Sequence, residues 1–434
     1  MQLRNVVLVD GVRSPFARGG RGKLVATRLD DAGATIIRTL LERNPKVKPS
    51  MIEDVGLGNV AQSGEFIGLG HVARLAGLPM EVSAFNVNRQ CGSSMETLQR
   101  IVSGIAVGAL DCGISLGIER MGRTLGGGGG GQRPNVTRVN QPRRLELNKQ
   151  QRDMSEDHGK YFSVPFPDYI LDATPMQSML QTAQNVAEIY SISRAELDEF
   201  TVRSHKKYGE AFQKGNYKDE IIPLEIEEPV YDDEGNWVPD SKGKMITFDI
   251  DEGYRPGTNF EALQNLKPVQ GYVSFANKEL VITAGNACPT NDGVSAALLM
   301  AEDKARELGL EPIARIVGMG VAGVKPQLMG IGPIPSTHKA ARNAGITMDQ
   351  IDRVEFNEAF AAQVIPTLRD LGISEDKVNV NGGSLAIGHP MGATGARLVT
   401  TVSKELRRSG KKYGLATQCI GAGMGISTIV EALY

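Results

Sequence analysis

The sequence has few cysteines, and their spacing excludes two classes of protein. Four cysteines occur in 434 residues, and no two of them form a C-x-x-C pair. This distribution argues against a zinc ribbon and against a disulfide framework, and it favours a reducing compartment. The four thiols are Cys91, Cys112, Cys288 and Cys419.

The sequence also has little net charge and no long apolar run. Its 48 basic and 50 acidic residues give a net charge of −2, so no overall field attracts nucleic acid, and a phosphate-bearing ligand must be held by local groups. No run of eighteen apolar residues occurs, and the apolar run near the N-terminus is too short for a signal peptide. We therefore expect a cytoplasmic protein with no membrane span and no nucleic-acid partner.

Alternating strand-like and helix-like patterns predict the fold class. Residues 5–12 form a β-branched apolar run, residues 29–41 have helical spacing, and residues 52–58 return to a strand pattern. This alternation predicts an α/β fold with a largely parallel sheet. The core pattern resumes at 280–285, and we expect a helix over 293–308.

The C-terminal part of the chain repeats the pattern of the N-terminal part. Residues 351–357 echo residues 52–58, and the segment 378–381 echoes 85–88 in the same order. A glycine-rich turn, a helix over about 394–409 and a strand over 413–419 follow the second echo. We expect two related α/β halves stacked in layers. Because ligands tend to bind beyond the carboxyl ends of strands, the two halves can share one site. The predicted segments are 1–121 and 255–310 for the N-terminal half, 122–254 for an inserted loop domain, and 311–434 for the C-terminal half.

The insertion contains a glycine run and a small basic cluster. The run Gly126 to Gly131 has no Lys-Ser/Thr after it and no helix start, so a flexible loop is favoured over a phosphate cradle. Ser193 and Glu196 are spaced as a capping box before a helix. The basic cluster is usually a solvated face, and we keep it as a weak phosphate candidate. Its members are Arg203, His205, Lys206 and Lys207.

Three turns are candidates for one site. Cys91 follows a strand pattern at the mouth of a predicted helix, where backbone N–H groups favour thiolate and hence a nucleophile, although most such thiols are inert buried residues. His389 lies in the glycine-rich turn 382–392, and Cys419 opens the turn 419–425. A lone histidine is more often structural than catalytic, but three turns of this kind at the ends of strands predict an active site.

Seven motifs give the chain a resemblance to the thiolases, the family of 3-ketoacyl-CoA thiolases and acetyl-CoA acetyltransferases. They occur in the family order over nearly the whole chain. As they stand here, they are NRQCGSSMETL (88–98), DEGYRPGTNFEALQNLKP (251–268), TAGNACPTNDGVSAALLM (283–300), MGIGPIP (329–335), EFNEAFAAQ (355–363), NVNGGSLAIGHPMGATGAR (379–397) and QCIGAGMG (418–425).

The resemblance implies a role for each residue of the site. Cys91 is the nucleophile that is acylated, and His389 is the base that takes its proton. Cys419 exchanges the α-proton of acetyl-CoA. One oxyanion site consists of His389 with a water held by Asn357, and the other consists of the backbone N–H groups of Cys91 and Gly421.

The resemblance also implies that coenzyme A binds as a substrate, with no permanently bound cofactor and no metal. The insertion is then the CoA-binding loop domain. Residues matching the family's CoA contacts are Arg255, Ala284, Cys288, Met179, Ala359 and Phe360. Two stretches depart from the family pattern. Residues 178–184 read SMLQTAQ without the usual histidine and acidic residue, and Cys288 stands where a serine is usual.

The expected activity is that of an acetyl-CoA C-acyltransferase in fatty acid β-oxidation, working by ping-pong transfer through acyl-Cys91. An enzyme that makes acetoacetyl-CoA from acetyl-CoA is the alternative within the family. A non-catalytic subunit of the same fold is a more distant alternative, and it should have lost a residue of the site. Asn357 and Cys419 argue against a sterol-carrier-type thiolase and a ketoacyl synthase. We expect a homodimer or homotetramer, with a partner subunit of a β-oxidation complex as a further option.

Overall fold

The computed structural model describes residues 3–61, 70–122, 161–171, 173, 177–239 and 241–434. The six-glycine run lies outside these residues. The described strands are β1 (Val6–Arg13), β2 (Ala17–Arg18), β3 (Asp54–Gly58), β4 (Ser83–Val87), β5 (Cys112–Arg120), β6 (Leu224–Glu227), β7 (Met245–Phe248), β8 (Asn291–Ala301), β9 (Ala314–Gly323), β10 (Arg353–Phe356), β11 (Tyr413–Ile420) and β12 (Met424–Ala432). The described α-helices are α1 (Leu29–Arg43), α2 (His71–Leu75), α3 (Ser93–Ala106), α5 (Asp168–Leu171), α6 (Met179–Ile189), α7 (Arg194–Gln213), α8 (Phe260–Gln264), α9 (Glu302–Glu307), α10 (Pro333–Ala344), α11 (Ala361–Leu371), α12 (Ser384–Ile387) and α13 (Met391–Ser409).

Ten of the described strands form one sheet in which the two halves have matching strand orders. The order is β10-β11-β12-β9-β1-β8-β5-β3-β4, with β2 beside β8. From its middle outward, β9, β12, β11 and β10 correspond to β1, β8, β5 and β3. The halves meet where β1 pairs with β9, at the two residue pairs Val7 with Arg315 and Leu8 with Ala314. This symmetry confirms the prediction of two related α/β halves.

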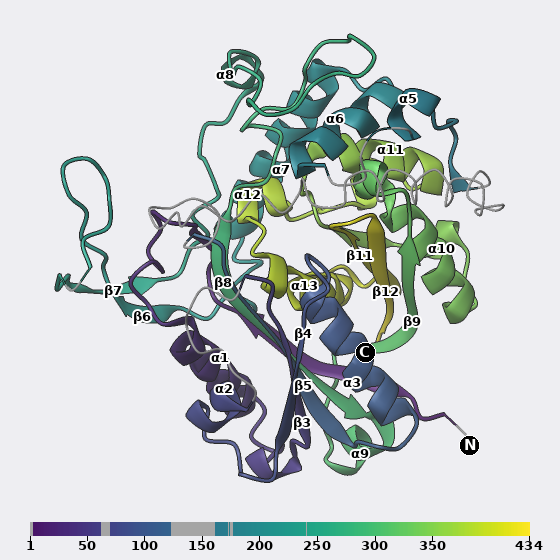
Figure 1. The fold of residues 1–434 in the computed structure, drawn as a ribbon. Helices are drawn as coiled ribbons and strands as arrows, with labels where there is room; N and C mark the ends of the chain where they lie inside the picture. The colour runs from purple at the N-terminus through teal and green to yellow at the C-terminus, as the bar shows by residue number, and fades with distance from the viewer. Residues whose placement is uncertain (1–2, 62–69, 123–160, 172, 174–176, 240) are drawn as a thin grey trace, which may run out of the picture.

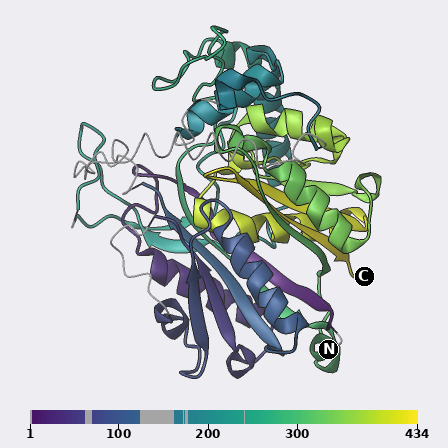
Figure 2. The same cartoon turned by 45° about the vertical axis from the view of Figure 1, so that its right-hand side comes forward.

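The helices divide the molecule into layers. Helices α3 and α13 pack against each other, and each contacts strands of both halves, so they form a shared middle layer. Helix α1 contacts β1, β5 and β8 on one side of the molecule, while α10 contacts β9, β11 and β12 on the other. In Figures 1 and 2 the N-terminal strands lie below the C-terminal strands, and the helices of the insertion lie above both.

Two predictions about the sheet are wrong. The sheet is mixed, because β8 runs antiparallel to both β1 and β5, and β12 runs antiparallel to both β9 and β11. Residues 293–301 belong to strand β8, and only Glu302–Glu307 is helical. Ala, Leu and Met favour helices in isolation, but all eleven residues of β8 are buried inside the sheet, and packing outweighs that preference. The segment 280–285 is irregular.

Other local predictions are confirmed. Helix α7 begins after Ser193, whose side chain accepts from the backbone N–H of Glu196, and the capping box is complete. The predicted helices over 29–41 and 394–409 and the strands over 5–12, 52–58 and 413–419 all form within a few residues of the expected bounds. The four predicted domain segments stay a prediction.

A buried ion cluster anchors the insertion to β1. The guanidinium of Arg13, fully buried at the end of β1, bonds Glu220 at 2.5 Å and binds both carboxylate oxygens of Asp251, at 2.6 and 2.9 Å. Removing Arg13 would leave two buried carboxylates without this cation, and breaking a buried ion pair in this way typically costs about 3–5 kcal/mol. The inserted segments are therefore held firmly against the core near the ends of the strands.

Candidate active site

The turn between β4 and α3 carries Cys91. Gln90 has a positive φ of 48°, an uncommon conformation for a residue other than glycine. Two hydrogen bonds hold it: the hydroxyl of Ser93 donates to the carbonyl of Gln90 at 2.6 Å, and the N–H of Gln90 bonds the side chain of Asn88 at 3.0 Å. Such strain persists only where the surroundings fix it, as at many active sites. Cys91 is buried, with 8% of its surface exposed.

The hairpin between β11 and β12 brings Cys419 to the same place. The amide of Gln418 donates to the carbonyl of Cys91 at 2.7 Å, which links β11 to the turn. A Cβ atom at Gly92 would lie 2.7 Å from Ile420, so glycine is needed for this close approach. Cys419 itself is fully buried. Two of the three predicted turns therefore meet.

The third turn holds His389 in a defined tautomer. The hydroxyl of Thr394 donates to the carbonyl of Pro390 at 2.9 Å, so its oxygen accepts from Nδ1–H of His389 at 2.7 Å. The other ring nitrogen, Nε2, then carries a lone pair, and it faces the amide nitrogen of Asn357 at 3.2 Å. A neutral imidazole with this tautomer can accept a proton at Nε2.

A chain of buried side chains orients Asn357. The hydroxyl of Ser384 donates to Oδ1 of Asn357 at 2.7 Å, which turns the amide nitrogen of Asn357 toward His389. The oxygen of Ser384 accepts in turn from Arg397 at 3.1 Å. Arg397 pairs with Glu355 at 2.6 Å, and burial raises the pKa of that carboxyl to about 8 although Arg397 opposes the rise. Because Arg397 can only donate, Ser384 accepts from it and donates its own proton to Asn357, which fixes the orientation of the Asn357 amide.

Burial changes the proton affinities of the two central groups. It raises the pKa of the Cys91 thiol to about 11, although hydrogen bonds from the backbone N–H groups of Gly421 and of Cys91 itself lower it. Burial and the charge of Arg397 lower the pKa of His389 to about 3. Both groups are neutral near pH 7. The backbone donors lower the pKa of the Cys91 thiol, as its place at the helix start predicts, but desolvation outweighs them.

Three sulfurs share the site. A negative charge on Cys91 raises the pKa of both Cys419 and Cys288, in addition to the larger effect of burial. The side chain of Gln363 lowers the pKa of Cys419. Cys288 is joined to the segment after β10, since its N–H donates to the carbonyl of Ala359 at 3.0 Å. The structure thus brings Cys288 and Ala359 beside the predicted catalytic residues.

The other predicted CoA contacts are spread around this centre. Phe360 is buried and forms a β-bridge with Ala287, next to Cys288. Ala284 lies in the same irregular turn, before Asn286, whose side chain accepts from the N–H of Thr283. Met179 is 39% exposed at the start of α6.

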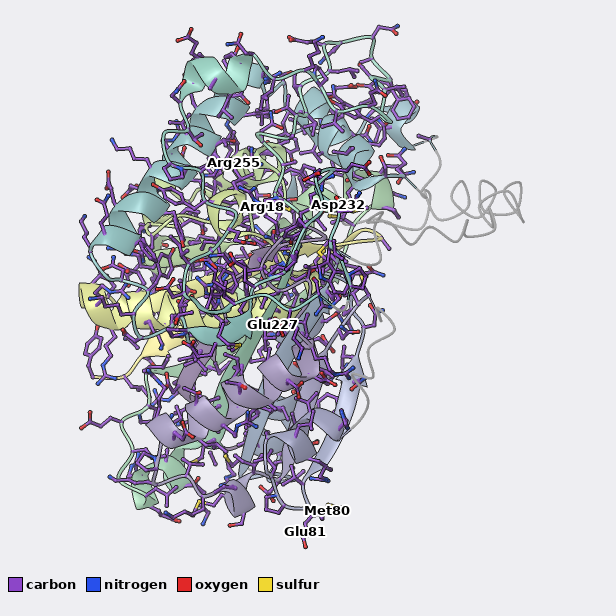
Figure 3. All side chains as sticks on the ribbon, turned by 90° about the vertical axis from the view of Figure 1, so that its left-hand side faces the viewer. Arg18, Met80, Glu81, Glu227, Asp232 and Arg255 are labelled. Carbon is purple, nitrogen blue, oxygen red and sulfur yellow. The ribbon has the colours of Figure 1, made fainter. Side chains whose placement is uncertain are left out.

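Arg255 lines a cavity of about 290 Å³ against helix α7. His205, Lys206 and Tyr254 line the same cavity. Burial and the charge of Arg255 lower the pKa of His205 to about 4, so it is neutral near pH 7. Figure 3 places Arg255 in the upper part of the molecule, opposite the end that carries Met80.

The predicted basic cluster divides into two parts. Arg203 pairs with Glu375 at 2.7 Å, and Lys207 donates to the carbonyl of Val378 at 2.9 Å, so both tie α7 to the C-terminal half. His205 and Lys206 face the cavity of Arg255. Only this second pair is placed to meet a ligand.

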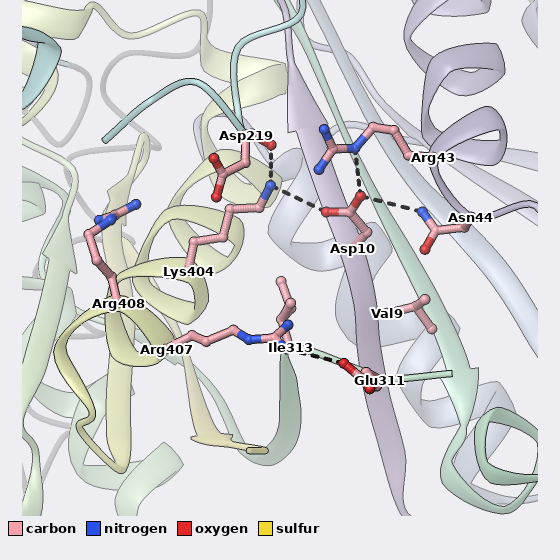
Figure 4. A pocket seen from close by; sticks show the side chains of 10 residues that line it. All are labelled: Val9, Asp10, Arg43, Asn44, Asp219, Glu311, Ile313, Lys404, Arg407 and Arg408. Carbon is pink, nitrogen blue, oxygen red and sulfur yellow. Dashed lines mark hydrogen bonds and ion pairs between the residues drawn. The ribbon is translucent and has the colours of Figure 1, made fainter. Parts of the chain in front are cut away.

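A larger cavity, of about 440 Å³, contains none of the predicted site residues (Figure 4). Lys404 and Arg43 both bond the carboxylate of Asp10, at 3.2 and 2.9 Å. Cations at the ends of α1 and α13 are also favoured by the helix dipoles. The lining residues are Val9, Asp10, Arg43, Asn44, Asp219, Glu311, Ile313, Lys404, Arg407 and Arg408.

Several residues of the site were not found from the sequence. Ser384, Thr394, Gln363 and Gln418 all contact a predicted catalytic residue. Ser384 had a signal, because it follows the second N-V-N segment by the same three residues as Cys91 follows the first. The other three lie within the family motifs, but nothing in their spacing indicates their contacts.

Within the described ranges, no helix is long and apolar enough to cross a membrane. In the same part of the chain, no group of three or more His, Cys, Asp or Glu side chains is arranged to hold a metal ion.

Comparison with known proteins gives one consistent family. Models of the thiolase N-terminal domain and the thiolase C-terminal domain match residues 6–303 and 310–432. Proteins named 3-ketoacyl-CoA thiolase from Vibrio vulnificus and Vibrio cholerae are each 38% identical to this chain over 434 residues, covering 99% of this chain and 100% of theirs.

Solved structures agree with these relatives. Human mitochondrial 3-ketoacyl-CoA thiolase has a TM-score of 0.79 and 30% identity, with complete coverage of both chains. The acetyl-CoA acetyltransferase of Bacillus anthracis has the same TM-score and 32% identity, again with complete coverage. The human enzyme in complex with CoA also has a TM-score of 0.79, at 30% identity, covering 99% of this chain and 98% of that one.

Proposed function

The chain belongs to the thiolase family, and we propose that it is an acetyl-CoA C-acyltransferase of the 3-ketoacyl-CoA thiolase type. The observation that carries the proposal is the meeting of three distant turns around Cys91. The backbone N–H of Gly421 lowers the pKa of the Cys91 thiol, and a charge on Cys91 raises the pKa of Cys419, while the imidazole of His389 has its lone pair on Nε2. These are the groups that carbon–carbon cleavage by thiolysis needs.

The first half-reaction transfers the acyl group to the enzyme. Cys91 gives its proton to Nε2 of His389, and its sulfur attacks the 3-keto carbonyl carbon of the substrate. The bond between the 2- and 3-carbons then breaks. Cys419 donates its proton to the enolate, which leaves as acetyl-CoA. A shortened acyl group remains on Cys91 as a thioester.

The second half-reaction releases the shortened product. The thiol of a new CoA gives its proton to the Cys419 thiolate left by the first half-reaction and attacks the acyl-Cys91 carbonyl. When the tetrahedral intermediate collapses, the Cys91 sulfur leaves and takes back the proton held by His389, so both groups return to their starting states. The negative oxygen needs preorganised donors at this stage, and we assign them to the backbone N–H groups of Cys91 and Gly421. Both N–H groups lower the pKa of the Cys91 thiol, which places them close to the reacting sulfur. The enolate oxygen of acetyl-CoA is assigned to His389 with a water on Asn357.

We assign the CoA contacts to two regions. Arg255 with Lys206 would meet the nucleotide end of CoA in the cavity beside α7, because both cations line it. Ala284, Cys288, Met179, Ala359 and Phe360 would line the path of the pantetheine chain. The contact between Cys288 and Ala359, close to the catalytic thiols, supports this assignment.

A thiolysis assay with substrates of different acyl length tests the function. The protein is mixed with acetoacetyl-CoA or a longer 3-ketoacyl-CoA and with CoA, and the loss of enolate absorbance is followed. Substrate added without CoA should leave an acyl adduct on Cys91 in mass spectrometry. Absence of cleavage at every chain length, or an acyl adduct on another residue, contradicts the proposal.

The same series separates the second candidate, which makes acetoacetyl-CoA from two acetyl-CoA molecules. The 32% identity to an acetyl-CoA acetyltransferase favours keeping it. A preference for acetoacetyl-CoA over every longer substrate would support it. The non-catalytic alternative is disfavoured, because Cys91, Asn357, His389 and Cys419 are all present. We further propose a cytoplasmic enzyme of fatty acid β-oxidation that forms a homodimer or homotetramer, with or without a partner subunit.

A further inference from the structure

A buried carboxylate at the end of β5 holds two loops of the active site. Glu119 has no exposed surface. One of its oxygens, Oε1, accepts from the N–H of Ala61 at 2.8 Å. The other, Oε2, accepts from the N–H groups of Val60 at 3.1 Å and Gly392 at 2.8 Å. A single side chain thus joins the segment after β3 to the first turn of α13.

The bond to Gly392 fixes the turn that carries His389. Gly392 follows His389 by three residues, and its N–H is one of those that a helix leaves unbonded at its start. A Cβ atom at Gly392 would lie 2.7 Å from the carbonyl oxygens of both Gly58 and Ile118. The start of α13 is therefore pressed against the strand ends of the other half, with Glu119 as its hydrogen-bond acceptor.

Three other side chains of the N-terminal half support the same turn. Asn291 accepts from the N–H of His389 at 3.0 Å, and the hydroxyl of Ser295 donates to the carbonyl of Ala393 at 2.5 Å. The hydroxyl oxygen of Ser94 accepts from the N–H of Ala396 at 3.0 Å. In this group Glu119 alone carries an ionisable side chain.

Glu119 also acts on the nucleophile through its charge. Burial raises the pKa of Glu119 to about 7 against three backbone N–H groups that lower it, and Asp292 on the neighbouring strand β8 raises it further. The charge of Glu119 raises the pKa of Cys91. The carboxylate therefore lies within electrostatic reach of the nucleophile while it holds the turn of the base.

We propose that Glu119 is a positioning residue that fixes the imidazole of His389 relative to the thiol of Cys91. This inference rests on the proposed function, because it gives Glu119 a part in the transfer of the Cys91 proton to His389. No other residue in the described chain bonds both Ala61 and Gly392.

The variant Glu119→Gln tests the proposal. Glutamine has nearly the same shape, but its amide NH2 faces either the N–H of Ala61 or those of Val60 and Gly392. Glu119→Leu, measured beside it, removes the bond to Gly392 in every orientation. We expect kcat for thiolysis to fall about 10- to 100-fold, because a shift of about 1 Å in a catalytic group has an effect of this size. We expect KM for CoA to stay within about threefold, because the cavity of Arg255 is not touched.

Hydrogen exchange gives a second readout that does not depend on activity. Amides of residues 389–394 should exchange faster in Glu119→Leu than in the wild type. Asp352→Asn is the matched control, because Asp352 also accepts from two backbone N–H groups, those of Lys412 and Tyr413, both at 3.0 Å. Its effect on exchange should fall near residues 412–413 and spare 389–394.

The two readouts distinguish this inference from the function on which it rests. Unchanged exchange at 389–394 in folded Glu119→Leu overturns the positioning role, and so does a kcat for that variant within threefold of an active wild type. A wild type that cleaves no 3-ketoacyl-CoA overturns the proposed function instead, and the exchange measurement still decides whether Glu119 holds the turn. Equal acceleration in Glu119→Leu and Asp352→Asn indicates general loosening and also overturns the inference.

Discussion

The two halves of the molecule share a strand order but have different chemistry at matching positions. Gly113 pairs with Asp54 in the N-terminal half, and Gly414 pairs with Arg353 in the C-terminal half, which aligns the strands. Four residues beyond Asp54 the first half has Gly58, whereas the second half has Asn357 beyond Arg353. The N-terminal half therefore has no side chain at the position that matches Asn357.

The same alignment applies to the neighbouring strands and turns. Ile118 in β5 occupies the place of Cys419 in β11. Cys91 and Ser384 are each the third residue after an N-V-N segment, so the place of the nucleophile in one half holds the hydroxyl that orients Asn357 in the other. One half thus contributes the proposed nucleophile, and the other contributes the proposed base, the amide and the second thiol. The two repeated halves therefore bring chemically different side chains to one site.

The largest expected effect comes from removing the thiol that the N-terminal turn contributes. We expect Cys91→Ser to lower kcat by at least about 10³-fold, because a buried hydroxyl is a far weaker nucleophile than a thiol. The thiolysis assay and mass spectrometry of the acyl adduct measure this. Cys112→Ser is the matched control, since Cys112 is buried in β5 away from the site, and it should keep most of the activity. A Cys91→Ser protein with a tenth of the normal kcat would contradict the assignment of the nucleophile to the N-terminal half.

The next largest effect is expected from removing the side chain of Asn357, so that the C-terminal half resembles the N-terminal half at this position. Asn357→Gly copies Gly58, and we expect kcat to fall about 10²- to 10³-fold, as when one donor of an oxyanion site is removed. Steady-state kinetics should show the loss in kcat rather than in KM. Asn59→Ala, which removes a buried amide that donates to Ile118 at 2.8 Å, is a control for general loss of packing. An equal loss in both variants would contradict a specific role for Asn357.

A smaller effect is expected at Ser384, which occupies in the C-terminal half the position that Cys91 occupies in the N-terminal half. Ser384→Ala removes the hydroxyl that fixes the amide of Asn357, and we expect kcat to fall about tenfold, the size of one lost buried hydrogen bond. The pH at which kcat declines should also shift, because the amide is then free to present its oxygen to His389. Ser403→Ala, whose hydroxyl bonds only the carbonyl of Val399 within α13, should leave both properties unchanged. Wild-type kinetics in Ser384→Ala would show that the hydrogen bonds from Arg397 through Ser384 to Asn357 do not contribute to the reaction.

The smallest effect is expected at Cys288, beside the two catalytic thiols. Cys288→Ser introduces a stronger hydrogen-bond donor of similar size, and we expect KM for CoA to fall about two- to threefold with kcat unchanged. Initial rates at varied CoA measure this. An unchanged KM would show that Cys288 does not face the bound pantetheine chain, and a large loss of kcat would give this thiol a role that we have not assigned.

The sequence predicts the paired halves and the three turns because each depends on a local pattern. Cys91, His389 and Cys419 all lie in short glycine-rich segments after strands, and such segments can be recognised without knowing what packs against them. Glu119 and Gln418 gave no such signal, because their roles arise only when residues far apart in the chain meet. Strand β8 was mistaken for a helix for the same reason, since its Ala- and Leu-rich composition becomes a strand only between β1 and β5. The protonation state of Cys91 also depended on burial, which a motif does not reveal.

Strand β8 has a consequence for how the chain is made. The C-terminal sheet, β9 to β12, is contiguous, with only helices and turns between its strands, whereas β1 and β5 are bridged by β8, which follows the entire insertion. Until β8 has been synthesised, the apolar strand β1 has no partner among the strands that precede β8, and β5 has an open edge. Such edges invite aggregation, and pairings of high sequence separation form slowly. We therefore expect synthesis in cells to rely on chaperones that shield the incomplete sheet until residue 301 has emerged.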